Sequence, residues 1–199
     1  MSTNRLGAWL RWLTGAATVV FIAGQCLAVA VLVIALVPHS PVTVDLPAAA
    51  LTGLEHLAGV TDGAAVDRAG HVLFRIADPS LVQRLLSLAM VLPGLLLVVE
   101  IARRLRHLLR AAQVSDPFRA DTAHALTLVA KVTAVGGVAV WAVGQASQGL
   151  LAASVLTSPV PFRPQESPLG WLAVALILAG FGQLLGRGVA MRAELDTVI

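Results

Sequence analysis

Aspartate, glutamate, lysine and arginine are absent from the whole stretch between Arg11 and Asp45. Two further charge-free windows cover residues 132–162 and 167–186. A helix rises about 1.5 Å per residue, so roughly 20 apolar residues suffice to cross a hydrocarbon core of about 30 Å. Each window is at least that long, and the sequence therefore predicts three membrane-spanning helices.

The composition agrees with a membrane protein and excludes several other classes. Only 13% of the residues are charged and 57% are hydrophobic, whereas a soluble domain carries about 25% charged residues. An intrinsically disordered chain would show the opposite balance. The lone Cys26 excludes a disulfide-stabilised scaffold, and we interpret it as a small apolar packing residue.

A fourth span is predicted at residues 85–99, although this segment holds only 15 residues between Arg84 and Glu100. The two charged side chains reach the membrane surfaces if they snorkel. Pro93 would break a soluble helix, but membrane helices tolerate proline where neighbouring helices satisfy the freed backbone groups. A re-entrant segment is the alternative, and the distribution of basic residues decides between the two.

The basic residues favour four spans with both termini in the cytoplasm. In that topology ten of them lie inside, namely Arg5, Arg11, Arg103, Arg104, Arg106, Arg110, Arg119, Lys131, Arg187 and Arg192. Four lie outside, namely Arg68, Arg75, Arg84 and Arg163. The positive-inside rule expects this asymmetry, which is lost if residues 85–99 do not cross. We therefore predict an all-α integral protein of the cell membrane, a single four-helix transmembrane bundle with spans at about 13–37, 83–103, 124–155 and 168–189.

The longest connection, residues 38–80, is predicted to form an extracytoplasmic cap. Its segments PVTVDLP and HVLFRI alternate between two sets of residues with period two, which is typical of short strands. We expect a small β-hairpin whose strands are joined by a helical turn in residues 50–59. The cap is either a structural lid, which we favour, or a ligand sensor. The proline-rich loop 158–168 is expected to be stiff and extended.

A cytoplasmic helical hairpin is predicted from residues 104–123. Asp116 is a suitable helix N-cap and Pro117 a suitable first helical residue, so the second span should turn there and return as the third. A turn at these residues places Glu100 opposite Lys131. We expect apolar contacts near the turn and a Glu100–Lys131 ion pair at the membrane boundary, where an unpaired charge is costly. A rotation that pairs polar residues along the whole hairpin is the alternative.

Two groups of residues are predicted to form a cytoplasmic interaction surface. Four arginines follow the second span, namely Arg103, Arg104, Arg106 and Arg110. The turn and the C-terminal tail contribute Asp116, Pro117, Phe118, Arg192, Glu194, Leu195 and Asp196. The arginines either contact anionic lipid headgroups or an acidic partner, or they only set the topology. Trp9 and Trp12 are expected to anchor the inner edge of the first span at the membrane interface.

The segment LLRAAQVSDPFRADTAHAL and the tail RGVAMRAELDTVI, together with the four spans, resemble the bacterial membrane protein family called domain of unknown function 2975. The matching residues are Asp116, Pro117 and Phe118 in the turn and Arg192, Glu194, Leu195, Asp196 and Val198 in the tail. Thr197 departs from the glycine that is frequent in the family. The resemblance implies a four-helix membrane protein without an established activity. It also implies a small helix-turn-helix regulator as partner, since members are often encoded beside one.

The sequence offers no pattern of an active site. Glycine-rich phosphate loops, metal-spaced cysteine and histidine sets and nucleophile elbows do not occur. We therefore predict a non-enzymatic regulatory or scaffold component that contacts a cytoplasmic partner, without a catalytic residue, cofactor, metal site or direct nucleic-acid contact. The alternative is a small transporter or channel subunit, which needs a water-accessible cavity reaching Gln145 or Gln148. The spacing of Gly182 and Gly186 serves either packing within the chain, which we favour, or homo-oligomerisation.

Overall fold

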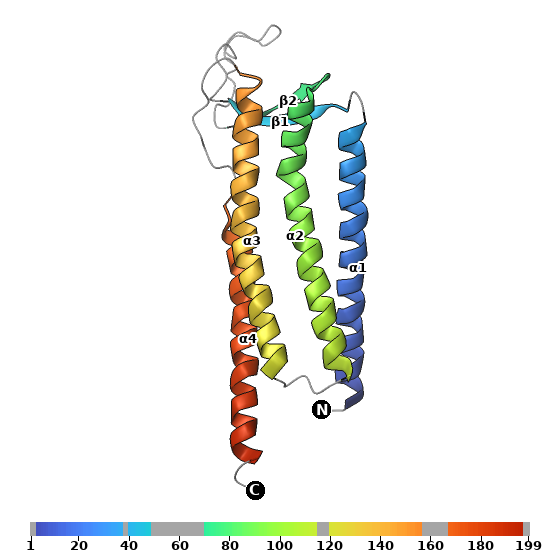
Figure 1. Cartoon of the computed structure of the whole chain (residues 1–199), viewed down its shortest axis with the longest axis vertical. Helices are drawn as coiled ribbons and strands as arrows, with labels where there is room; N and C mark the ends of the chain where they lie inside the picture. Colours follow the sequence, from blue (N-terminus) through green and yellow to red (C-terminus); the bar gives the residue numbers. More distant parts are fainter. Residues whose placement is uncertain (1–2, 38–39, 49–69, 115–119, 157–166, 197–199) are drawn as a thin grey trace, which may run out of the picture. The chain divides into compact units, whose positions relative to one another are not determined.

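The computed structural model (Figure 1) describes residues 3–37, 40–48, 70–114, 120–156 and 167–196. The elements follow the order α1 (Thr3–Leu36), β1 (Val42–Pro47), β2 (His71–Ile76), α2 (Leu81–Val114), α3 (Ala120–Ala153) and α4 (Leu169–Asp196). Each described helix contains a segment that is long and apolar enough to span a membrane, namely Arg11–Leu36, Leu81–Gln113, Asp121–Ala153 and Leu169–Met191. The predicted helical class, with four such helices and a two-stranded hairpin, is therefore confirmed.

The second helix is longer than the span predicted from its apolar residues. It passes through Pro93 without ending, although proline removes one backbone hydrogen bond from the helix. It continues past residue 103 to Val114, and α3 begins at Ala120. Residues 115–119 between α2 and α3 lie outside the described residues, so the helical hairpin predicted from residues 104–123 stays a prediction.

The chain divides into two compact units, and each is described by itself. Unit 1 contains Met1–Val31, Leu92–Ala142 and Glu166–Ile199, and unit 2 contains Leu32–Val91 and Val143–Gln165. Three helices therefore contribute residues to both units, whereas α4 belongs to unit 1 alone. The prediction of a single membrane domain stays a prediction.

Helices of unit 1 approach one another closely at glycines. A Cβ atom placed on Gly24 of α1 would lie 2.7 Å from Cγ2 of Val99 on α2. A Cβ placed on Gly136 of α3 would lie 2.7 Å from Cδ1 of Leu97. These distances are shorter than van der Waals contact, so the helices come this close only because the glycines lack a side chain. Leu97 and Val99 are about 200° apart around α2, which therefore packs against α1 and α3 with opposite faces.

Glycines also line the contact between α3 and α4. A Cβ placed on Gly137 would lie 2.4 Å from Cβ of Trp171, and one placed on Gly182 would lie 3.4 Å from the carbonyl oxygen of Ala123. A Cβ on Gly186 would lie 3.9 Å from Cβ of Ala123. The contact positions advance along α4 as they recede along α3, so the two helices are antiparallel. The role predicted for Gly182 in packing within the chain is therefore confirmed, and homo-oligomerisation stays a prediction.

The two strands of unit 2 form the predicted antiparallel hairpin. Val42 pairs with Ile76 and Val44 with Phe74, so alternate residues of both strands share one face. Val42 and Val44 are buried there and pack with Leu151 of α3 in the hydrophobic core of this unit. The period-two pattern of the sequence is thus explained by one buried and one exposed face. The predicted helical turn between the strands lies outside the described residues.

Polar contacts connect the helix ends of unit 2. Ser80 and Gln83 form a reciprocal cap at the start of α2, because each backbone N–H donates to the other's side chain, at 2.9 and 3.3 Å. Gln83 also donates from Nε2 to Oγ of Ser154 beyond the end of α3, at 3.1 Å. Arg84 donates from Nη1 to the carbonyl oxygen of Val37 at 3.3 Å. The Ser80–Gln83 and Arg84–Val37 bonds satisfy backbone groups that helix ends leave without partners, whereas the Gln83–Ser154 bond joins two side chains.

Candidate functional site

A cluster of charged side chains on α2 is built around Glu100. Arg103 donates from Nε to Oε2 at 2.7 Å and from Nη2 to Oε1 at 2.8 Å, and Arg104 donates from Nε to Oε1 at 2.6 Å. Spacings of three and four residues bring these side chains to the same side of the helix. Two parallel bonds from one guanidinium match the geometry of a carboxylate. We call these three residues the Glu100 cluster.

The predicted ion pair between Glu100 and Lys131 is not formed, and this corrects the sequence-based expectation. Both carboxylate oxygens of Glu100 accept from arginines of α2, and Lys131 is exposed on α3. Because Leu97 packs at Gly136, the antiparallel register places Glu100 level with Thr133, two residues from the predicted partner. Arg103 and Arg104 lie on the same helix as Glu100, so their ion pairs do not depend on how α2 and α3 are aligned.

The guanidinium of Arg106 lies over an aromatic ring of a neighbouring helix. Its Cζ atom is 4.4 Å from the ring centroid of Phe21 on α1, a geometry in which the ring face attracts the cation. Its Nε atom is buried and has no hydrogen-bond partner in the part of the chain that the structure describes. Sequence reasoning missed Phe21, because no pattern within one helix indicates which residue of another helix it meets.

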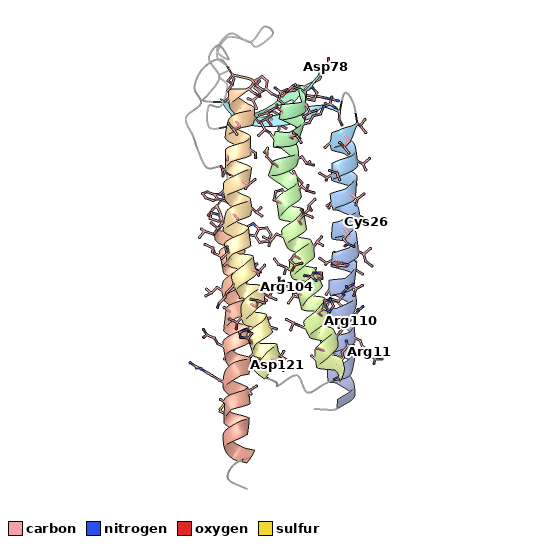
Figure 2. All side chains as sticks on the ribbon, viewed as in Figure 1. Arg11, Cys26, Asp78, Arg104, Arg110 and Asp121 are labelled. Carbon is pink, nitrogen blue, oxygen red and sulfur yellow. The ribbon has the colours of Figure 1, made fainter. Side chains whose placement is uncertain are left out.

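The other residues of the predicted interaction surface belong to different elements. Figure 2 shows Arg104 and Arg110 on α2, and Arg110 is exposed. The turn residues lie outside the described residues, namely Asp116, Pro117 and Phe118. The tail residues belong to the last turns of α4, namely Arg192, Glu194, Leu195 and Asp196. The predicted surface therefore consists of an arginine-rich part of α2 and a helical tail.

The tail of α4 extends past the beginning of α3, as Figure 1 shows. Gly186 lies beside Ala123, near the start of α3 at Ala120, and α4 continues to Asp196. About seven residues of α4, or about 10 Å of helix, therefore lie beyond the first residue of α3. The sequence predicted a tail here but did not indicate that it is a continuation of the fourth helix.

The transporter alternative needs a water-accessible cavity that reaches Gln145 or Gln148, so the burial of the polar residues of α3 bears on it. In unit 2, Gln145 is 8% exposed and Ser147 is 5% exposed. Buried amide and hydroxyl groups of this kind commonly form contacts between membrane helices. In unit 1, Thr133 donates from Oγ1 to the carbonyl oxygen of Val129 at 2.9 Å, so its hydroxyl is satisfied within its own helix. Among the described residues, no group of three histidine, cysteine, aspartate or glutamate side chains is placed to hold a metal ion.

Replacing Glu100 with glutamine is expected to lower the free energy of unfolding by about 1–2 kcal/mol, because two guanidinium groups lose their charged acceptor. Lys131→Gln serves as the matched control and is expected to change it by less than about 0.5 kcal/mol. Thermal unfolding of the full chain in detergent, followed by circular dichroism, measures both variants. Equal losses in the two variants would argue for the Glu100–Lys131 pair instead.

No protein-family model, no curated protein and no solved structure matches this chain. The candidate site is therefore defined by the chain's own residues, namely the Glu100 cluster, Arg106 over Phe21, Arg110 and the tail of α4. Membership of the domain of unknown function 2975 family stays a prediction from the turn and tail motifs.

Proposed function

We propose that this chain is a non-enzymatic component of the cell membrane that contacts a cytoplasmic partner, as a regulator or scaffold. In this proposal four helices cross the bilayer, both termini lie in the cytoplasm and the β1–β2 hairpin lies on the outer side. The partner class implied by the family resemblance is a small helix-turn-helix regulator.

Exposed apolar side chains support the membrane location. Large hydrophobic residues of α1 and α4 face outward, among them Val19, Leu176 and Leu184, which are 65%, 74% and 65% exposed. Apolar surface left in water costs about 25 cal/mol per Å², whereas lipid chains are as apolar as these side chains. The excess of basic residues in the segments that this topology places toward the cytoplasmic side supports the orientation.

The extension of α4 beyond the start of α3 is the observation that carries the proposed contact with a partner. The extension carries residues of both charge signs, namely Arg192, Glu194 and Asp196. It lies beyond the first residue of α3, so α3 does not run beside it. Complementary charges at such a helix end favour a specific partner and a defined orientation. The tail is therefore the part of the chain that we expect a soluble protein to bind.

A photo-crosslinking amino acid at Glu194 tests this contact in the membrane of cells that express the full chain. The expected result is a discrete adduct with one soluble protein, which also co-purifies with the full chain but not with a chain that ends at residue 189. Leu176, a highly exposed residue of the same helix, is the control position and is expected to give lipid adducts alone. Identical adducts at both positions, or equal recovery of the protein without the tail, would contradict the proposal.

A further inference from the structure

The arginine-rich part of α2 lies beside the charge-free part of α1. Within unit 1, the guanidinium of Arg106 lies over the ring of Phe21. Seven residues, or about two turns, further along α2, Gln113 donates from Nε2 to Oγ1 of Thr14 at 2.7 Å. The two contacts establish an antiparallel register between the helices. The arginines of α2 therefore run alongside a segment of α1 that contains no charged residue.

This register places Arg106 well inside the bilayer if α1 crosses it as proposed. The apolar segment of α1 begins at Arg11. Trp9 and Trp12 form an exposed edge-to-face pair with ring centroids 5.9 Å apart, which suits the membrane–water interface. Phe21 lies about 15 Å further along the helix axis than Arg11. The charge of Arg106 is therefore held deeper than the aromatic residues that mark the interface.

Positive charge exceeds negative charge in this part of α2. The side chains of Arg103 and Arg104 share one carboxylate, that of Glu100. Neither Arg106 nor Arg110 forms an ion pair with any residue that the structure describes. A guanidinium in a medium of low dielectric constant is costly unless an anion approaches it. An external anion would therefore stabilise this stretch of α2.

We propose that Arg103, Arg106 and Arg110 bind the phosphate group of an anionic lipid in the cytoplasmic leaflet. Spacings of three and four residues place the three side chains on one side of α2. A guanidinium presents a planar set of donors that matches phosphate oxygens and stays charged at physiological pH. The Cζ atom of Arg106 lies 4.4 Å from the ring centroid of Phe21, and in the proposal the terminal N–H groups of this guanidinium donate to the phosphate. The inference rests on the proposed membrane location but not on the cytoplasmic partner.

The surroundings of Arg106 favour a lipid over soluble phosphate as the source of the anion. Val20 and Ile22, the chain neighbours of Phe21, are exposed apolar residues. Acyl chains of a bound lipid gain from contact with such surface. A soluble phosphate ion would have to lose water to reach the same depth. In the proposal, snorkelling of the arginine side chains and local thinning of the bilayer bring the lipid phosphate and the guanidinium groups together, while the lipid chains remain in the bilayer.

Native mass spectrometry of the full chain in detergent, with phosphatidylglycerol or phosphatidylcholine added, tests the site. The wild type is expected to retain phosphatidylglycerol at least about tenfold more tightly than phosphatidylcholine, and Arg106→Gln to weaken phosphatidylglycerol binding about fivefold or more. Arg187→Gln removes an exposed arginine of α4 and is the matched control, with binding unchanged. Equal retention of the two lipids, or equal binding by the Arg106 and Arg187 variants, would overturn the proposal.

Two further variants separate a loss of lipid binding from a loss of folding. Arg110→Gln changes an exposed residue and is expected to weaken phosphatidylglycerol binding severalfold without affecting thermal unfolding in phosphatidylcholine. Phe21→Leu keeps an apolar side chain but removes the ring, and is expected to weaken binding about two- to fivefold. Unchanged binding in both variants would overturn the site.

A competition experiment with inorganic phosphate distinguishes a lipid phosphate from a soluble phosphate ion. Millimolar inorganic phosphate is expected to leave bound phosphatidylglycerol in place, because the lipid is also held through its acyl chains. Displacement of the lipid by inorganic phosphate would assign the site to a soluble anion and overturn the lipid proposal. Crosslinking at Glu194 does not depend on these arginines, so the lipid site and the cytoplasmic contact can fail separately.

Discussion

Replacing Gly137 with alanine is expected to force α3 and α4 apart and to lower the free energy of unfolding by about 1–3 kcal/mol. The new Cβ atom would lie 2.4 Å from Cβ and 2.6 Å from Cγ of Trp171. These two atoms are close to the α4 backbone, so a change of side-chain rotamer moves Cγ but leaves Cβ in place. The helix itself must shift, and thermal unfolding of the full chain in detergent measures the cost.

Gly180→Ala is the matched control for this prediction. Gly180 lies on α4, and a Cβ placed on it would have no neighbouring atom within 4 Å. Alanine is favoured over glycine in a helix by up to about 1 kcal/mol, so this variant is expected to be as stable as the wild type or slightly more stable. Equal destabilisation of the Gly137 and Gly180 variants would contradict close packing between α3 and α4.

Replacing Val44 with aspartate is expected to detach the β1–β2 hairpin from the helices of unit 2. Val44 is 2% exposed and packs in the core that contains Leu151. Leaving an uncompensated charge in such a place costs about 3–5 kcal/mol, and two short strands without a packed face are at best marginally stable. Hydrogen exchange of the backbone amides in the strands is expected to accelerate by at least about a hundredfold.

Thr43→Asp provides the control for the hairpin. Thr43 is the preceding residue of the same strand and is exposed, so its side chain points away from the core. The same charge at this position is expected to leave hydrogen exchange within about threefold of the wild type. Rapid exchange in both variants, or in neither, would contradict a hairpin with one buried face.

Much of the fold was predictable because it follows from patterns local in sequence. The charge-free windows predicted the helices, since a long apolar segment needs no distant partner to be recognised. The alternation around Val44 and Phe74 predicted the strands and their shared face, which the pairing confirms. The end of α4 was less predictable, because nothing in the charged tail marks where the helix stops.

The candidate site was less predictable because its contacts depend on how helices pack. The arginine-rich part of α2 was identified from charge alone, and the Glu100–Arg103 and Glu100–Arg104 pairs have spacings that sequence inspection can recognise. The prediction instead favoured Lys131, because a turn of assumed length was used to set the register between α2 and α3. Phe21 carries no signal of its own, since any residue of that apolar segment was an equally suitable neighbour of Arg106.

Labelling of single cysteines in intact cells tests the four-span topology most directly. In a Cys26→Ala background, cysteine is introduced at Leu73 of β2 or at Met191 of α4, two positions that are 73% and 60% exposed. Each variant is treated with a membrane-impermeant maleimide before and after permeabilisation. The topology predicts that Leu73→Cys is labelled in intact cells and that Met191→Cys is labelled only after permeabilisation. Labelling of Met191→Cys in intact cells, or protection of Leu73→Cys, would contradict it.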